Sequence, residues 1–115
     1  MGLDMMMYGG AKYGNKYKVK GNEEIAYWRK HPNLHGYIVN TFADGVDDCR
    51  DIPLTKENIE NIIQAVRDNK LPHTDGFFFG ESRKEYDEYT LDLLSKVLAK
   101  MIADPNYKVT YTASW

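Results

Sequence analysis

Three consecutive phenylalanines, Phe77 to Phe79, stand between two glycines in the second half of the chain. Side chains alternate between the two faces of a strand, so Phe77 and Phe79 are expected to be buried together while Phe78 points the other way. The flanking glycines permit positive φ angles or the close approach of another backbone segment. We therefore expect residues 71–82 to anchor the core and to form one wall of a pocket.

The length of 115 residues fits a single domain that can bury a core without disulfides or a structural metal. The single cysteine, Cys49, excludes an internal disulfide and fits a reducing compartment. The formal net charge of -2 gives no electrostatic footprint for duplex nucleic acid. No apolar run approaches the length of a membrane span, and the first residues lack a signal pattern. We therefore expect a cytoplasmic protein, located in the host cytoplasm if a phage encodes it.

The first part of the chain predicts two strands followed by two helices. Residues 3–8 form a compact apolar run that suits a buried strand. A tight turn is expected before residues 16–20, where lysines alternate with other residues as in a half-exposed strand. Asn22 and the two glutamates after it favour a helix that extends to Lys30. Pro32 cannot lie inside that helix, so we expect a second helix to begin here with Pro32 in its first turn.

The remaining chain predicts a short strand, two helices and a final strand. Residues 51–54 are expected to be extended, with a proline typical of an edge strand. Thr55 is expected to cap a helix with an isoleucine-rich apolar stripe. A long helix follows over residues 86–103, and residues 107–115 are rich in β-branched and aromatic side chains, as in a strand. The predicted fold class is α+β, in which the N- and C-terminal strands form a small antiparallel sheet covered by three to four helices.

Apolar residues that recur at helical spacing define the expected core faces of two helices. In the helix that begins near Pro32 they are Leu34, Tyr37, Ile38 and Phe42. In the long helix they are Leu93, Leu94, Val97, Leu98, Met101 and Ile102.

Two internal motifs resemble the signatures of a widespread family of small bacterial and phage proteins. Residues 24–36 read EIAYWRKHPNLHG, and residues 71–82 read LPHTDGFFFGES. The two ends, LDMMMY at residues 3–8 and YTASW at residues 111–115, are also similar, so the resemblance covers essentially the whole chain. Family members often end in paired tryptophans, whereas this chain ends in Trp115 alone. The resemblance implies a frequent phage context but no reaction, because the family is usually left uncharacterised.

Some members of that family carry the label phosphoglycerate kinase, which the residues of this chain do not support. A chain of 115 residues is far too short for such a two-lobed enzyme. The sequence also has no glycine-rich phosphate loop followed by Lys-Ser or Lys-Thr.

The histidines and the cysteine raise two chemical hypotheses. His31 and His35 are four residues apart and, with His73 and Cys49, would supply the ligands of a metal site. Because Pro32 disrupts the helix that would hold the first pair, we favour structural roles, in which His31 caps the second helix and His35 bonds to a backbone carbonyl. A thiol nucleophile would require a histidine oriented toward Cys49, and nothing in the sequence orients such a pair.

A tryptophan, an arginine, a lysine and a histidine follow one another at residues 28–31. An indole beside two cations can stack on a base and neutralise a phosphate. The alternative is that Trp28 packs in the core and the cations bond to carboxylates at residues 81–88. In either case we expect Arg29 to contact a carboxylate of residues 81–88 or of the acidic loop at residues 47–51, which is otherwise expected to be solvated.

We expect a non-enzymatic protein that recognises a small anionic, nucleotide-like ligand and that, in a phage, would sequester a host-defence signal. The candidate ligand-binding residues are Trp28, Arg29, Lys30, His31, His35, His73, Phe78, Glu81 and Trp115. No catalytic residue, metal ligand or cofactor is assigned. The alternatives are a protein-interaction module that inhibits a host enzyme, with exposed tyrosines and Trp115 as its hot spot, and a small metal-dependent hydrolase. Assembly into a homo-oligomer is compatible with each hypothesis.

Overall fold

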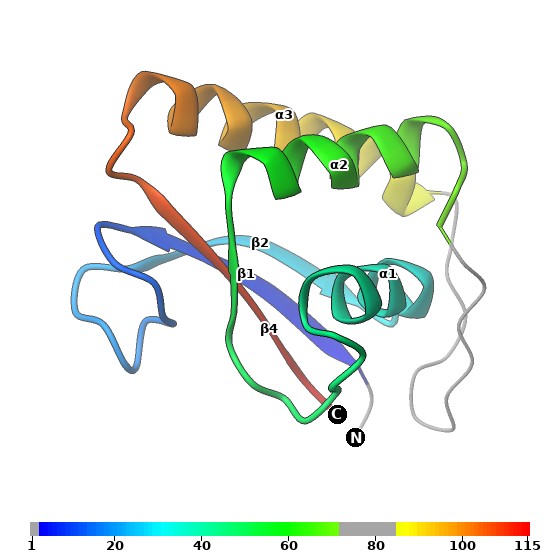
Figure 1. Ribbon diagram of the computed structural model, residues 1–115, viewed down its shortest axis with the longest axis horizontal. Coiled ribbons are helices and arrows are strands. Elements are labelled where there is room, and N and C mark those ends of the chain that lie inside the picture. The colour runs from blue at the N-terminus through cyan, green and yellow to red at the C-terminus, as the bar shows by residue number, and fades with distance from the viewer. Residues whose placement is uncertain (1–2, 72–84) are drawn as a thin grey trace.

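The computed structural model describes residues 3–71 and 85–115 (Figure 1). Its elements in chain order are β1 (Asp4–Gly10), β2 (Glu23–Arg29), α1 (Pro32–Phe42), β3 (Ile52–Leu54), α2 (Lys56–Arg67), α3 (Glu85–Ala103) and β4 (Lys108–Ser114). The predicted phenylalanine anchor lies outside the described residues, as do His73, Phe78 and Glu81.

The four strands form one antiparallel sheet in the order β2-β1-β4-β3. The predicted pairing of the first and last strands is confirmed, because β1 and β4 pair from Asp4 opposite Ser114 to Gly10 opposite Lys108. The two ends of the chain consequently lie close together (Figure 1). With three helices in the described residues, the architecture is the predicted α+β class.

The core lies between the sheet and the helices. α2 and α3 pack side by side over one face of the sheet (Figure 1). Full burial of a large apolar side chain in this core stabilises the fold by roughly 1.5–3 kcal/mol. The fully buried residues from the strands are Met5, Met7, Trp28, Leu54, Val109 and Tyr111, and those from the helices are Leu34, Ile38, Ile59, Ile62 and Leu94.

The predicted helix over residues 22–30 is wrong, because this segment is the edge strand β2. Its side chains alternate, with Ala26 and Trp28 buried and Tyr27 exposed between them. Trp28 lies opposite Met5 on β1, so the strand brings its large indole into the core beside another apolar side chain. The local helix signals are therefore outweighed by long-range strand pairing and burial, which no local pattern contains.

The edge strand β2 is irregular where it pairs with β1. Tyr8 of β1 pairs with Glu24 and the preceding residue of β1 pairs with Ala26, so Ile25 is the extra residue of a β-bulge. Further along the edge, the backbone N–H of Tyr27 donates to the hydroxyl of Tyr89 on α3 at 3.4 Å. A bulge and a covering side chain both disfavour pairing with another strand at this edge.

The predicted strand over residues 16–20 is also wrong, because this segment forms turns. The side-chain oxygen of Asn15 accepts the backbone N–H of Tyr17 at 2.9 Å, which holds the chain in a tight local turn. The backbone N–H of Gly14 donates to the hydroxyl of Thr110 at 2.8 Å and ties the segment to β4. The partner of β1 at this edge is β2 instead.

The predicted restart at Pro32 is confirmed, because α1 begins with this proline in its first turn. His31 occupies the N-cap position, but its side chain makes no capping hydrogen bond to the described helix, so its predicted capping role is wrong. Leu34 and Ile38 are fully buried and confirm the predicted core face of α1.

Thr55 caps α2 as predicted. Its hydroxyl accepts the backbone N–H of Asn58 at 3.1 Å, and the Asn58 side chain accepts the backbone N–H of Thr55 at 2.9 Å. This reciprocal pair satisfies two backbone donors at the start of the helix. The preceding strand β3 contains Pro53 and lies at the edge of the sheet, again as predicted.

The long helix α3 is confirmed, with Leu94, Val97 and Met101 buried against the core. The prediction for Ile102 is wrong, because its side chain is 60% exposed. A helix advances by about 100° per residue, so the position after Met101 turns away from the sheet. No helix in residues 3–71 and 85–115 is long and apolar enough to cross a membrane.

Candidate functional site

A buried polar network joins α1, the loop before β3 and β4 at His35. Its Nδ1 lies 2.6 Å from the hydroxyl of Tyr111, and its Nε2 lies 2.9 Å from a carboxylate oxygen of Asp47. A carboxylate accepts hydrogen bonds, so Nε2 carries the proton and donates to Asp47, while Nδ1 accepts from Tyr111. Within the described residues, the partners of the His35 ring are a carboxylate and a phenol, not the backbone carbonyl that the sequence suggested.

Burial sets the ionisation of this network. Desolvation lowers the pKa of His35, and the neighbouring Asp47 opposes that effect. The pKa of Tyr111 is raised well above its ordinary value, chiefly by burial and then by the charge of Asp47. The phenol is therefore a neutral hydrogen-bond donor at physiological pH. The neutral imidazole in turn donates its Nε2–H to the carboxylate of Asp47.

Asp47 also connects the network to the surface, since its carboxylate accepts the indole N–H of Trp115 at 3.2 Å. Trp115 is 40% exposed, and the side chain of Asp47 is 30% exposed. The structure thus brings together two of the predicted site residues, His35 and Trp115, through an acid that the sequence placed in a solvated loop.

Cys49 lines the same small cavity as His35, Asp47 and Tyr111, which has a volume of about 10 Å³. Cys49 is exposed, and its backbone adopts a left-handed φ of 62°. Both ring nitrogens of His35 already have hydrogen-bond partners, so this imidazole is not positioned to take a proton from the thiol. The arrangement does not favour the thiol-nucleophile hypothesis.

A second cluster forms where the start of α3 meets the end of β2. The indole N–H of Trp28 donates to the hydroxyl of Thr90 at 2.8 Å, and the ring makes an edge contact with Tyr89 at a centroid distance of 6.2 Å. Nε2 of the buried His31 lies 3.9 Å from a carboxylate oxygen of Asp87. Burial lowers the pKa of His31 to about 4, so the ring is neutral at physiological pH.

This cluster decides whether Trp28 packs in the core or stacks on a ligand. Trp28 is fully buried, so it packs in the core and presents no ring face to a ligand. Arg29 and Lys30 are exposed, and Arg29 makes no ion pair with a carboxylate whose side chain the structure describes, including those of the loop at residues 47–51. The part of the Arg29 prediction that concerns residues 81–86 stays a prediction, because their side chains are outside the described part of the chain.

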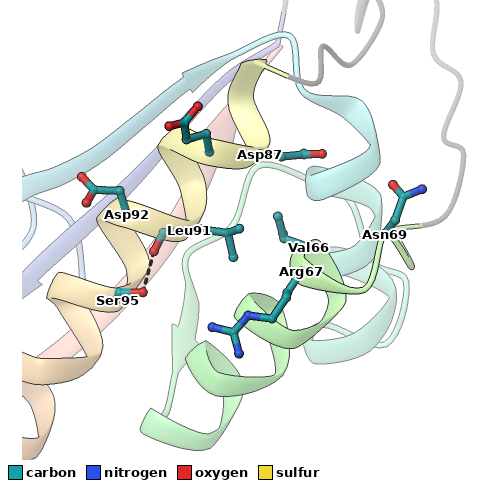
Figure 2. A pocket seen from close by; sticks show the side chains of 8 residues that line it. Val66, Arg67, Asn69, Asp87, Leu91, Asp92 and Ser95 are labelled. Atoms are coloured by element: carbon teal, nitrogen blue, oxygen red, sulfur yellow. Dashed lines mark hydrogen bonds between the residues drawn. The ribbon is translucent and has the colours of Figure 1, made fainter.

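A groove between α2 and α3 has a volume of about 780 Å³ (Figure 2). Leu91 and Val66 point into the space between the two helices, with Arg67 beside them (Figure 2). The hydroxyl of Ser95 donates to the backbone carbonyl of Leu91 at 2.6 Å, so its proton is already used in a hydrogen bond within α3. The full lining is Val66, Arg67, Asn69, Asp87, Glu88, Leu91, Asp92 and Ser95.

A second depression of about 470 Å³ continues along the same helices and shares Arg67 and Ser95 with the first. Its lining is Glu60, Ile63, Gln64, Arg67, Ser95, Leu98, Ala99 and Ile102. We call the two together the seam groove. The helices were predicted, but the groove was missed, because it depends on how two helices 18 or more residues apart in the chain pack together. The local signal for it is a second set of apolar residues at helical spacing on the long helix, Leu91, Leu98 and Ile102.

Asp47 and Tyr111 were likewise missed as site residues. Tyr111 was assigned to a strand and Asp47 to a loop, and neither assignment indicates that a histidine lies between them. Within the described residues, no group of three or more histidine, cysteine, aspartate or glutamate side chains is arranged to hold a metal ion. His73, the proposed third metal ligand, lies outside these residues.

Comparisons with protein-family models, with curated proteins and with solved structures found no match for this chain.

Proposed function

We propose that this protein is a non-enzymatic binding protein that docks a segment of another protein in the seam groove. The observation that carries this proposal is the continuous depression along α2 and α3, which has an apolar floor and polar rims. Contact surfaces between proteins combine an apolar centre with a polar rim in this way. A ligand-sized volume at a helix seam is also a common place for binding sites.

The charges of the groove favour a macromolecular partner over the anionic ligand expected from the sequence. Asp87, Glu88 and Asp92 line its first part, where Arg67 is the one cationic side chain among the described residues. A nucleotide phosphate would lie near three carboxylates and would be repelled by them. The protein-interaction alternative therefore has more support at this site than the nucleotide hypothesis.

A photo-crosslinking amino acid placed at Ser95 tests the proposal in the cells that produce the protein. The matched control places it at Tyr17, which is 84% exposed on the segment between β1 and β2. We expect a partner that is captured from position 95 and absent from position 17. The captured protein is then purified, and its affinity is measured by calorimetry against the unmodified chain, Ile102→Lys and Tyr17→Lys.

Ile102→Lys is expected to weaken binding by about tenfold or more, whereas Tyr17→Lys leaves it within about twofold. Both substitutions place one positive charge at an exposed large side chain, so the main difference between the two variants is whether the charge lies in the groove. Equal capture at both positions contradicts the proposal. Capture of residues 72–84 of the same chain, or of a second copy of it, also contradicts docking of a different protein.

The nucleotide-like ligand remains a second candidate at a different place. Tyr27 is 41% exposed on β2, and Arg29 lies two positions along on the same face of the strand. An exposed phenol ring beside a guanidinium can stack on a base and bind a phosphate. Tyr27 thus replaces the buried Trp28 as the candidate stacking ring, with Arg29 and Lys30 as the cations.

Calorimetry with a panel of mono- and cyclic nucleotides tests this second candidate. Binding that is weakened about tenfold by Arg29→Lys, with an unchanged melting temperature, supports it, because lysine cannot form the two-pronged phosphate contact. Absence of heat across the panel removes the candidate.

A further inference from the structure

One face of α3 carries an apolar stripe in addition to the stripe that packs on the sheet. The apolar Leu91, Leu98 and Ile102, with the small Ser95 among them, lie at positions separated by four, three and four residues. All four line the seam groove, whereas the sheet-facing stripe is Leu94, Val97 and Met101. Intervals of three and four residues keep side chains on one face of a helix, and helices use this spacing to pack against other helices.

The second stripe is only partly covered by α2. Leu91 and Leu98 are half-buried, and Ile102 at its far end is 60% exposed. From Leu91 to Ile102 the stripe spans 12 residues, or about 17 Å of helix axis. A helix of about three turns lying along the seam would cover its whole length.

Acidic side chains border this stripe. Asp87, Glu88 and Asp92 on α3 and Glu60 on α2 line the groove, with Arg67 as the cation among them. Asp92 pairs with Lys96 at 3.2 Å, and this pair is largely exposed. Among the residues that the structure describes, the remaining carboxylates leave the rim negative, so an occupant with positive side chains on its flanks is complementary to it.

We infer that the occupant of the seam groove is a basic amphipathic helix of a partner protein, whose apolar face lies on Leu91, Leu98 and Ile102 and whose basic flanks face Glu88 and the neighbouring carboxylates. This inference deepens the proposed function and rests on it. Helix-in-groove docking provides the geometry, because an apolar stripe on the incoming helix meets the apolar floor at matching intervals. The negative rim decides the charge of the partner and makes the affinity fall with added salt.

Fluorescence anisotropy with three labelled peptides tests the inference. The first is an amphipathic 14-residue peptide of leucine and lysine, the second replaces each lysine by glutamate, and the third replaces each leucine of the first by serine. We expect the leucine–lysine peptide to bind, the leucine–glutamate peptide to bind at least about tenfold more weakly, and the serine–lysine peptide not to saturate below about 100 μM.

Matched charge reversals place the binding in the groove. Glu88→Lys and Glu24→Lys change the net charge equally, but Glu24 is exposed on β2 and lies outside the groove. We expect Glu88→Lys to weaken binding of the leucine–lysine peptide about tenfold and Glu24→Lys to change it less than about twofold. Circular dichroism of both variants checks that the fold is retained.

Equal effects of the two reversals overturn the inference, as does equal affinity for the leucine–lysine and leucine–glutamate peptides. Failure of the leucine–lysine peptide to bind below about 100 μM also overturns it. These failures are distinct from failure of the proposed function. If position 95 captures a partner whose docked segment is neither basic nor helical, the function stands and this inference is wrong.

Discussion

His35 and Tyr111 are 76 residues apart in the chain and share a hydrogen bond of 2.6 Å in the interior. The phenol donates to an imidazole whose other nitrogen is committed to Asp47. This bond fixes α1 against the final strand of the sheet, next to the C-terminal tryptophan. It is therefore expected to contribute to stability, and removal of its donor provides a direct test.

Tyr111→Phe keeps the ring and removes the hydroxyl, which leaves Nδ1 of the buried His35 without its phenol donor. An unsatisfied buried polar atom costs about 1–3 kcal/mol of unfolding free energy. Urea denaturation measures the loss. The control is Tyr17→Phe, which removes a hydroxyl from an 84% exposed side chain and should change stability by less than about 0.5 kcal/mol. Equal stability of the two variants would show that the bond contributes nothing.

Thr90→Val removes the acceptor of the Trp28 indole while it preserves the shape of the side chain. Thr90 and Trp28 are both fully buried, so the N–H is left without its partner away from water. The expected cost is about 1–3 kcal/mol, measured by thermal and urea unfolding. Thr41→Val, at an exposed position of α1, is the control. A loss no larger than that of the control argues against a structural role for this bond.

Gly10→Ala is expected to destabilise the protein by about 1–3 kcal/mol, because a methyl group there would overlap the side chain of Asn22. Asn22 cannot move aside cheaply, since its amide donates to the carbonyls of Lys12 and Gly14 at 3.1 and 2.7 Å. A double-mutant cycle with Asn22→Ala measures the overlap. The cost of Gly10→Ala should fall on that background, and an unchanged cost would point to backbone effects instead.

Stability should decrease as the pH falls from about 7.5 to about 5. Burial lowers the pKa of His31 from 6.5 to about 4, so over this range the unfolded chain takes up a proton that the folded protein does not. The expected loss is about 2 kcal/mol, and the lowered pKa of His35 acts in the same direction. Urea midpoints across the range measure it. His31→Gln should flatten the profile, and an unaltered slope would show that another group is responsible.

Several elements of this protein follow from local sequence. Pro32 sets the start of α1, because a proline is tolerated in the first turn and not inside a helix. Thr55 and Asn58 form the cap of α2 from residues three positions apart. The β-branched and aromatic content of β4 identifies a strand without any knowledge of its neighbours.

The segment 22–30 shows where local reasoning fails. A capping residue and two acids favour a helix, and yet the segment is β2. Strand pairing with β1 satisfies its backbone groups, and alternation buries Trp28 beside Met5. Both gains require a partner far away in sequence. The candidate site has the same origin, because the network at His35 joins residues 35, 47, 111 and 115.

The sequence by itself determined the α+β class, the pairing of the two terminal strands, the start of α1 and the cap of α2. The start of α1 and the cap of α2 depend on residue preferences within a few neighbouring positions, and the class and the strand pairing were inferred from the order and type of the predicted elements. Tertiary structure alone decided that residues 23–29 form a strand, that His35 lies between Asp47 and Tyr111, and that Ile102 borders an open seam. Burial and hydrogen bonding between distant segments supply more free energy than local preference, and they exist only once the chain has folded.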